Sequence, residues 1–338
     1  MSHKATLRPG NHVFAVADNE TILDAALREG HVIAYGCRNG ACGTCKGTVL
    51  DGRVDYGSHQ SSALTDAEKR QGYALFCQAR PLTDIVIETR EVNAAGGIQI
   101  KTLPCRVQKL ELAAGDVMTL ELKLPASERL QFLAGQYIDI ILKDGTRRSL
   151  SMANAPHDDA FLQLHLRNYG GPFSRHVFNT MKVRDILRFE GPFGTFFLRD
   201  SAKPIVLVAS GTGFAPIKSI IEHAFHTGVK RPLQLYWGAR KRADLYMDAL
   251  PTKWANEHSN FKYVPVLSEA PASDNWNGRT GLVHQAVMQD LPDLRDYQVY
   301  ACGAPAMVEA AHRDFITQCG LPDEEFFSDS FTPAVAPP

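Results

Sequence analysis

Four cysteines in the first part of the chain have the spacing of a metal centre. Cys37, Cys42 and Cys45 follow one another in a C-x4-C-x2-C pattern, and Cys77 stands alone further on. Plant-type [2Fe–2S] clusters are held in this way, because three thiolates come from a tight loop and the fourth from a separate element. Glycines within the loop let the backbone wrap closely and turn N–H groups toward the sulfurs. We therefore predict that these four cysteines are ligands of a [2Fe–2S] cluster.

The cysteine pattern fits zinc, Rieske and disulfide chemistry less well. Structural zinc sites usually have two C-x2-C pairs and only one is present, so a zinc-binding interaction module stays an alternative that metal analysis would separate. A Rieske centre needs two histidine ligands at motif spacing, and no such pair occurs. The chain has seven cysteines, an odd number, so a disulfide framework is not expected. Cys105 and Cys319 have no partners in the pattern and are predicted to be structural.

Two glycine-rich turns later in the chain are suited to bind phosphate. Residues 170–174, Gly-Gly-Pro-Phe-Ser, open a predicted helix whose N–H groups and dipole favour an anion, which Arg148 could also hold. Residues 210–216 follow a buried strand and precede a helix predicted from Ile217 onward. In this second turn Pro216 replaces the third glycine of the dinucleotide fingerprint. A helix cap with a surface arginine, and a tight strand–helix turn, are the plain alternatives.

Two further segments lie where parallel strands are predicted to end. Residues 237–246 and 300–307 both follow apolar runs. Ligands bind at the carboxyl edge of open α/β sheets, so we expect both segments to border a ligand site. The second contains Cys302, which taken alone is most simply a buried thiol.

Composition narrows the class of protein. The 338 residues are 44% hydrophobic and 22% charged, which is typical of a globular chain with more than one domain. Lys and Arg number 36 against 37 Asp and Glu, so the net charge of −1 gives no sign of binding to nucleic acid or to an anionic membrane. The apolar runs are far shorter than a membrane span and no signal peptide is visible, so we expect a soluble cytoplasmic protein.

The pattern of elements divides the chain into three parts and a linker. Residues 1–92 contain short strands and one helix, at 21–29, which predicts a small α+β unit. Residues 93–102 begin with the composition of a flexible linker. Residues 103–200 contain alternating strands, which predicts an antiparallel barrel. In residues 201–338 apolar strands alternate with helices, which predicts a parallel α/β sheet.

In combination, these motifs resemble the iron–sulfur flavoprotein reductases of the ferredoxin–NADP reductase superfamily. That resemblance covers nearly the whole chain and implies a multidomain fold: an α+β ferredoxin domain of the β-grasp type, an antiparallel β-barrel FAD domain and an α/β parallel-sheet NAD domain. Runs at 133–139, 191–197 and 327–331 are most similar to those of CDP-6-deoxy-Δ3,4-glucoseen reductases. The reductase components of bacterial ring-hydroxylating dioxygenases and other oxygenases share most of the motifs.

The resemblance implies which residues meet FAD. The family's R-x-Y-S pattern falls on Arg148, Ser149, Leu150 and Ser151, with the arginine on the FAD pyrophosphate and Ser151 beside flavin N5. Leu150 stands where the family has a tyrosine that lies against the flavin. Phe331 would shield the other flavin face until nicotinamide displaces it. The remaining expected FAD contacts are Arg167, Gly171, Pro172, Phe173 and Ser174.

The resemblance likewise implies a nicotinamide site. Cys302 would lie near nicotinamide C4, so Ser151 and Cys302 are the expected catalytic residues. The family favours NADH. NADPH stays an alternative, because Arg240, Lys241 and Arg242 could meet a 2′-phosphate, although a solvated basic turn is the commoner role of such residues. The expected contacts of the nicotinamide cofactor are Gly211, Thr212, Gly213, Pro216, Gly238, Arg240, Cys302 and Gly303.

The implied activity is electron transfer from NAD(P)H through FAD and a [2Fe–2S] cluster to a redox partner protein. A flavin suits this task because it accepts a hydride and releases single electrons. The partner would be a dehydratase or an oxygenase component that docks on the ferredoxin domain. A non-enzymatic iron–sulfur carrier or redox sensor is an alternative of another class, and the intact glycine turns at 170–174 and 211–216 argue against it.

Overall fold

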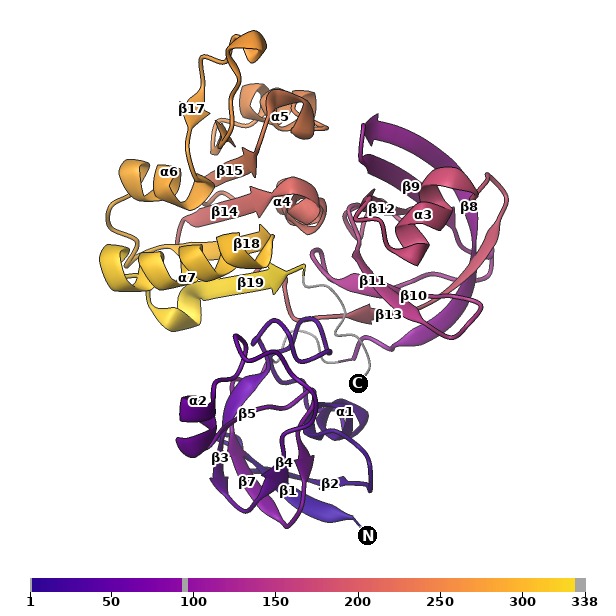
Figure 1. The fold of residues 1–338 in the computed structure, drawn as a ribbon, viewed down its shortest axis with the longest axis vertical. Helices are drawn as coiled ribbons and strands as arrows, with labels where there is room; N and C mark the ends of the chain where they lie inside the picture. The colour runs from indigo at the N-terminus through magenta and orange to yellow at the C-terminus, as the bar shows by residue number, and fades with distance from the viewer. Residues whose placement is uncertain (1, 93–96, 332–338) are drawn as a thin grey trace. The chain divides into compact units, whose positions relative to one another are not determined.

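A computed structural model describes residues 2–92 and 97–331, and Figure 1 shows the elements that they form. The chain divides into two compact units. The first holds the described residues up to Ile98 together with Phe331, and the second is Gln99–Ser330.

The first unit is the predicted α+β fold, built on a five-stranded sheet with the order β2-β1-β7-β3-β5. The strands β1 and β2 form an antiparallel hairpin, and β7 runs parallel to β1 in the middle of the sheet. A short pair of strands, β4 and β6, stands apart from this sheet. The elements are β1 (His3–Arg8), β2 (His12–Val16), α1 (Ile22–Arg28), β3 (Lys46–Asp51), β4 (Val54–Asp55), α2 (Asp66–Arg70), β5 (Tyr73–Leu75), β6 (Arg80–Pro81) and β7 (Ile85–Glu88).

Of the helices α1 and α2 in this unit, the sequence predicts only α1. The helix expected at 21–29 is α1: the Thr21 side chain accepts a hydrogen bond from the Asp24 N–H at 3.1 Å, and Gly30 follows with a φ of 85°. In contrast, α2 is not predicted, because it buries no residue and so has no apolar periodicity. A capping box between Thr65 and Glu68 starts it.

The second unit contains the predicted antiparallel barrel. Its six strands follow the order β11-β10-β13-β8-β9-β12, and a bridge between Met152 and Leu164 links the two ends of the sheet. The predicted linker at 93–102 lies partly outside the described residues and ends too late, because Lys101 already pairs with β13. The elements are β8 (Lys101–Ala114), β9 (Val117–Lys123), β10 (Tyr137–Ile141), β11 (Arg147–Ser151), β12 (Leu162–Arg167), α3 (Pro172–Asn179) and β13 (Ile186–Phe193).

The same unit contains the predicted parallel sheet, with the order β17-β16-β15-β14-β18-β19. The apolar runs correctly predicted β14, β15 and β18. The helix α4 begins at Phe214 rather than at the predicted Ile217, because Pro216 fits within a first turn, where its missing N–H breaks no helical hydrogen bond. The elements are β14 (Ile205–Ser210), α4 (Phe214–His226), β15 (Leu233–Ala239), α5 (Ala249–Glu257), β16 (Phe261–Leu267), β17 (Arg279–Thr280), α6 (Val283–Asp290), β18 (Gln298–Gly303), α7 (Pro305–Cys319) and β19 (Phe326–Ser330).

The strand order creates a switch point beside β14. From β14 the sheet grows through β15 and β16 on one side, and through β18 and β19 on the other (Figure 1). The loops that follow β14 and β18 therefore leave the same edge in different directions, which is where open α/β sheets bind ligands.

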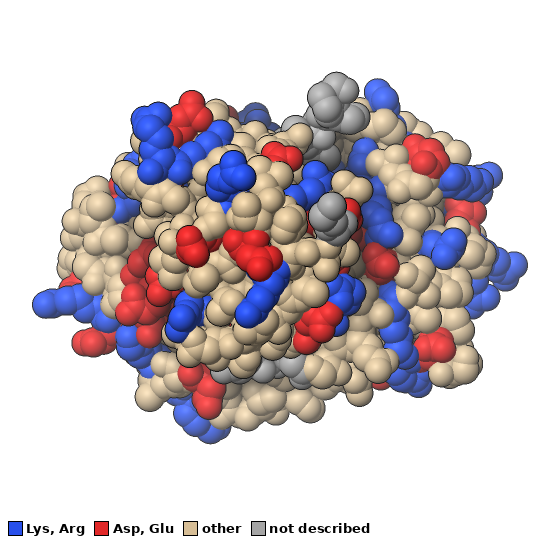
Figure 2. Space-filling view, turned by 90° about the horizontal axis from the view of Figure 1, so that it is seen from below, with Lys and Arg blue, Asp and Glu red and all other residues tan. Residues whose placement is uncertain are grey.

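The distribution of charge and the hydropathy of the helices agree with the composition. Acidic and basic side chains are interspersed over the face shown in Figure 2, as a net charge of −1 would suggest. Within residues 2–92 and 97–331, the structure contains no helix that is both long enough and apolar enough to cross a membrane.

Candidate functional site

The four predicted cluster ligands lie together in the first unit. Across their loop, the Cys37 N–H donates to the Cys42 sulfur and the Cys42 N–H to the Cys37 sulfur, both at 3.4 Å. Cys45 comes just before β3 and Cys77 just after β5, and the antiparallel pairing of these strands brings the two thiols into hydrogen-bond contact. Three thiols from one loop and a fourth from a separate strand thus meet at one place, which fits the ligands of a [2Fe–2S] cluster.

Hydrogen bonds within this thiol group favour the ionised form of two of the four cysteines, Cys37 and Cys77. A hydrogen bond from Cys42, together with backbone N–H groups of the loop, lowers the pKa of Cys37 to about 6. A hydrogen bond from Cys45 lowers the pKa of Cys77. The pKa of Cys42 and Cys45 is raised, because each thiol keeps its proton to donate a hydrogen bond to a neighbouring sulfur and because each is buried. Iron binds the thiolate form, so loading the cluster would release these retained protons.

The backbone of the cysteine loop is shaped by left-handed residues. The φ angles are 57° at Arg38, 74° at Gly40 and 78° at Gly43. At Gly40 an added Cβ would lie 2.6 Å from the carbonyl oxygen of Ser58, so this position has no room for a side chain. Gln78, which follows the fourth cysteine ligand, donates to the Arg38 carbonyl at 3.1 Å and ties the loop to that ligand.

The two remaining thiols expected to be structural lie elsewhere. Cys105 packs in the core of the barrel and Cys319 in the core of the α/β domain. Burial raises the pKa of Cys105 to about 12. Both surroundings fit a structural role, since an apolar site disfavours the reactive thiolate.

The first glycine turn begins α3, as predicted. Gly171 is the N-cap and Pro172 the first helical residue. Because glycine has no side chain to cap the helix, the first N–H groups of α3 are left to solvent or to a ligand, and a phosphate suits them. Phe173 and Ser174 are buried, and the Ser174 hydroxyl donates to the Gly171 carbonyl at 3.0 Å.

Residues 148–151 occupy β11 on alternating faces. Ser149 lies opposite Asp139 and donates its hydroxyl to that carboxylate at 2.6 Å. Leu150 lies opposite Ile138 and packs, half-buried, against the barrel core. Arg148 donates to the main-chain carbonyl of its neighbour at 2.7 Å. The contact of Leu150 with a flavin ring stays a prediction, with packing into the barrel core as the competing role.

The second glycine turn fits closely against the loop that follows β18. An added Cβ at Gly213 would lie 2.2 Å from the carbonyl oxygen of Cys302, and one at Gly303, where φ is 136°, would lie 2.2 Å from the Ser210 hydroxyl. That hydroxyl accepts a hydrogen bond from the Ala304 N–H at 2.9 Å. The two loops therefore form one surface at the switch point. Thr212 and Pro216, which are also predicted contacts of the nicotinamide cofactor, are buried beneath this surface.

Both predicted catalytic residues lie beside one carboxylate. Ser151, at the end of β11, donates its hydroxyl to Asp329 Oδ2 at 3.4 Å. Asp329 pairs with Cys302 across β18 and β19. Burial, with the nearby Asp329 charge, raises the pKa of the Cys302 thiol, which therefore stays protonated. No role is assigned to Asp329 from the sequence, although it lies within the run 327–331 that carries the resemblance, two residues before Phe331.

Arg167 lies against the second glycine turn. An added Cβ at Gly211 would come within 3.2 Å of Arg167 Nη1. The guanidinium Nε is 3.2 Å from a carboxylate oxygen of Asp116, but both Nε and Nη2 are buried and neither makes a hydrogen bond in the described protein. A buried cationic nitrogen beside a glycine turn is suited to an anionic ligand. The structure thus brings Arg167, predicted for FAD, next to the turn predicted for the nicotinamide cofactor.

The remaining predicted residues are less closely grouped. Gly238 is the second-last residue of β15, and an added Cβ there would lie 2.8 Å from Val283. Arg240 is exposed, with its Nε 4.0 Å from the Asp244 carboxylate. Phe331 follows β19 directly and is half-buried, and its contact with flavin stays a prediction.

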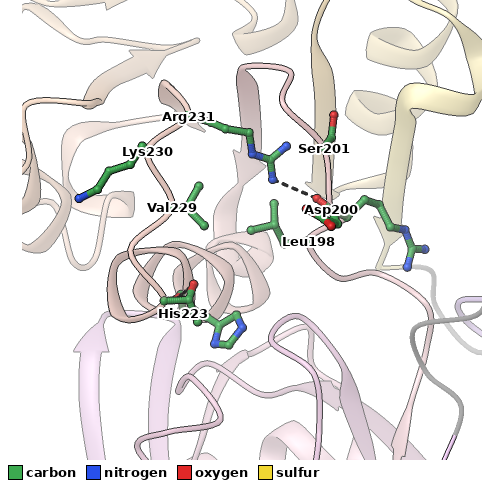
Figure 3. Close-up of a pocket in the computed structure, with 9 residues that line it drawn as sticks. Leu198, Asp200, Ser201, His223, Val229, Lys230 and Arg231 are labelled. Carbon is green, nitrogen blue, oxygen red and sulfur yellow. Dashed lines mark hydrogen bonds between the residues drawn. The ribbon is translucent and has the colours of Figure 1, made fainter.

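A separate cavity of about 370 Å³ lies at the amino ends of β14 and β15 (Figure 3). It is lined by residues 198–201, which lead into β14, and by residues of the connection from α4 to β15. Arg231 projects across it and donates to the Arg199 carbonyl at 3.0 Å and to Gln298 Oε1 at 2.9 Å. The cavity contains none of the predicted site residues, and Arg231 holds these connections together.

Three family models match the chain in the predicted order. Residues 5–82 match the 2Fe-2S iron-sulfur cluster binding domain. Residues 104–198 match the oxidoreductase FAD-binding domain, and residues 207–313 match the oxidoreductase NAD-binding domain.

Similar proteins extend over almost the full chain. CDP-6-deoxy-L-threo-D-glycero-4-hexulose-3-dehydrase reductase of Yersinia pseudotuberculosis is 42% identical over 335 residues, which cover 99% of this chain and 100% of that protein. Reductase component 2 of terephthalate 1,2-dioxygenase from Comamonas sp is 36% identical, with 98% of each chain covered. Among solved structures, the Amycolatopsis cytochrome P450 reductase GcoB has a TM-score of 0.82 and 33% identity, over 98% of this chain and 100% of that one.

Proposed function

The chain belongs to the iron–sulfur flavoprotein reductases, and from that premise we propose that it passes electrons from NADH to the dehydratase of a CDP-linked deoxyhexulose. It is an NAD(P)H-dependent oxidoreductase with a [2Fe–2S] cluster, FAD and a nicotinamide dinucleotide as cofactors. The sequence-based predictions of the enzyme class and of these cofactors are confirmed. The choice of partner is supported by the 42% identity to a dehydrase reductase over 99% of the chain.

We assign the cluster to the four thiols of the first unit. When bound, the flavin and the cluster together convert a hydride into single electrons. The protein's part is to supply Cys37, Cys42, Cys45 and Cys77 as thiolates, and the hydrogen bonds that lower the pKa of Cys37 and Cys77 support this role. The loop's N–H groups, which already donate to sulfur, would continue to stabilise negative charge there.

In the barrel, the FAD pyrophosphate is assigned to the N-terminus of α3 and to Arg148. The uncapped N-terminus at Gly171 supports this role, because its N–H groups attract an anion. Ser151 is assigned to the flavin ring edge. Its hydroxyl already donates to Asp329, so it is oriented with its oxygen lone pairs directed away from that carboxylate.

On the parallel sheet, the turn at 211–216 is assigned to the pyrophosphate of NADH. Arg167 supports this assignment with a buried guanidinium nitrogen that has no hydrogen-bond partner in the described residues. Cys302 is assigned to the nicotinamide ring. Its thiol is fully buried and stays protonated, so this side of the proposed nicotinamide position would be uncharged and closed to water.

The partner is proposed to bind the ferredoxin domain and to receive one electron at a time. An oxygenase component is the second candidate partner, supported by the 36% identity to a dioxygenase reductase. We also propose that the protein works in the cytoplasm, where the reducing environment keeps the cluster thiols from forming disulfides.

The partner is tested by coupling the holoprotein to each candidate. NADH consumption is measured with a CDP-6-deoxyhexulose dehydrase and its substrate, and separately with a terephthalate dioxygenase oxygenase component and terephthalate. Stimulation by the dehydrase alone is expected. Stimulation by the oxygenase alone would replace the first candidate by the second. Failure of NADH to reduce ferricyanide would refute electron transfer altogether.

A further inference from the structure

Trp237 holds one carbonyl of the second glycine turn. It is fully buried on β15, opposite Ala209 of β14, and its indole N–H donates to the Gly211 carbonyl oxygen at 3.1 Å. The same oxygen accepts the N–H of Phe214 at the start of α4. A carbonyl oxygen has two lone pairs, so these two donors satisfy it and direct it into the protein.

The orientation of this carbonyl decides what the turn offers to a ligand. Gly211 has a φ of 54°, in a region that glycine enters and leaves at little steric cost. If the Gly211 peptide rotated, its oxygen would face the ligand in place of an N–H group. A phosphate is held by N–H groups and repelled by a carbonyl oxygen. A donor that fixes the carbonyl therefore selects the phosphate-binding shape of the turn.

Two aromatic rings pack against the indole. The Phe214 ring stacks on Trp237 with centroids 4.0 Å apart and an angle of 15° between the rings. The Tyr246 ring meets the indole edge-on, at 5.2 Å and 89°. The Tyr246 hydroxyl is hydrogen-bonded, at 2.9 Å, to Nδ1 of His165, a buried residue of barrel strand β12. A continuous set of contacts thus runs from the barrel to the glycine turn.

We propose that Trp237 is a positioning residue for the nicotinamide cofactor, which acts by holding the Gly211 carbonyl away from the cofactor's pyrophosphate. This inference rests on the proposed function, in which the turn at 211–216 binds that pyrophosphate. The indole N–H makes the turn a better phosphate site without touching the reacting rings. It therefore contributes to the affinity for NADH and not to the rate of hydride transfer.

The test uses Trp237→Phe, which keeps an aromatic ring beside Phe214 and Tyr246 but removes the N–H. ADP-ribose is the probe, because it contains the pyrophosphate and cannot transfer a hydride. Calorimetric titration of the holoprotein should give a Kd for ADP-ribose that is roughly 3- to 10-fold weaker, the value of one neutral hydrogen bond. The Kd for NADH should rise similarly, while the limiting rate of flavin reduction at saturating NADH stays within about twofold.

Tyr236→Phe is the matched control. Tyr236 is the neighbouring residue on β15 and is equally buried, but it points to the opposite face, where its hydroxyl donates to Asp290 at 3.1 Å. This variant should bind ADP-ribose as the wild type does. If Trp237→Phe fails to retain FAD, Tyr246→Phe tests the same contacts, since it removes only the link to His165, and about a twofold weakening is expected.

Three outcomes would overturn the role of Trp237. The first is a folded Trp237→Phe protein that binds ADP-ribose as the wild type does. The second is a Tyr236→Phe protein whose affinity for ADP-ribose falls as much as that of Trp237→Phe. The third is a Trp237→Phe protein with a lower limiting rate of flavin reduction and an unchanged affinity. In each case the wild type still binds ADP-ribose and is reduced by NADH. A wild type that does neither would instead refute the proposed function.

Discussion

Ser151 and Asp329 join the barrel to the parallel sheet: the serine hydroxyl lies 3.4 Å from Asp329 Oδ2, and both residues are buried. Asp329 in turn lies beside Cys302 on the next strand. Two residues after Ser151, the Ala153 carbonyl accepts a hydrogen bond from Lys218 of α4 at 3.1 Å, which is a second contact between the α/β domain and the barrel. The relative positions of the two expected catalytic residues are therefore set by contacts between domains, not by either strand alone.

Ser151 and Asp329 should act as a unit. A hydrogen bond to a charged group is worth about 1.5–3 kcal/mol, so Asp329→Asn should slow flavin reduction by NADH roughly 10- to 100-fold while FAD stays bound. Stopped-flow absorption of the flavin measures this rate. The double variant Ser151→Ala/Asp329→Asn should be no slower than the slower single variant. If the fold decreases in rate of the two single variants multiply in the double variant, the two residues act independently and the coupling is contradicted.

Cys302→Ala should slow the same step with both the cluster and FAD retained. The thiol is fully buried at the carboxyl end of β18, and alanine would leave space for the nicotinamide ring to move or for water to enter. The limiting rate of flavin bleaching should fall, whereas Kd for ADP-ribose should stay unchanged. An unchanged bleaching rate would show that the role of Cys302 is purely structural.

Cys77→Ser should abolish the cluster and leave flavin chemistry in place. The loss of one thiolate opens the coordination of the irons, so iron and sulfide content should fall. Reduction of ferricyanide, which can draw on reduced flavin, should persist, and reduction of cytochrome c should drop sharply. Cys105→Ser is the control, because Cys105 lies in the barrel core, and it should keep two irons per flavin. The ligand assignment would be overturned if the Cys105→Ser protein lost the cluster while the Cys77→Ser protein kept it.

The parts of the molecule that the sequence predicts are those with local signals. The spacing of Cys37, Cys42 and Cys45 depends on one loop, and the apolar runs of the parallel strands depend on burial of both faces. The importance of Asp329 could not be read in this way, because it depends on the pairing of β19 with β18 and on barrel packing. Arg167 is expected to contact FAD, but its proximity to Gly211 could not be predicted, since Gly211 belongs to another domain.

Stability should fall in acid because of His165. Burial, with a smaller effect of the Lys218 charge, lowers the pKa of His165 to about 3. In the unfolded chain its pKa is about 6.5, so between these values only the unfolded state takes up the proton. The free energy of unfolding should therefore decrease as the pH falls below about 6.5, by an amount that approaches 1.4 kcal/mol per pH unit, and recover as the pH rises.

The variant His165→Gln tests this pH dependence. Glutamine can still bond Tyr246 but does not titrate, so the thermal midpoint should depend less steeply on pH between about 7 and 5. Fluorescence of the three tryptophans, which all lie in the second unit, follows its unfolding. The exposed His312→Gln is the control for loss of one imidazole. Equal slopes in wild type and His165→Gln would contradict the assignment.

Leu150→Tyr distinguishes two environments for one side chain. If Leu150 lies against the flavin, as the resemblance implies, tyrosine adds an aromatic stack worth about 0.5–1.5 kcal/mol, or roughly a three- to tenfold tighter Kd for FAD. Flavin fluorescence would also be quenched further by stacking. If Leu150 serves the barrel core, where it packs opposite Ile138, tyrosine would overfill the site and cost about 1–3 kcal/mol of stability.

Titration of the apoprotein with FAD, followed by a melting curve, decides between them. We expect tighter FAD binding, because Leu150 is only half-buried and a larger ring can extend past the core toward the ligand. The same titration on Ile138→Val, a change confined to the buried neighbour, should leave the affinity for FAD unchanged while lowering stability by about 1 kcal/mol. Weaker FAD binding by Leu150→Tyr with a lowered melting temperature would place Leu150 in the core, because overpacking there disturbs β11 and with it the flavin site.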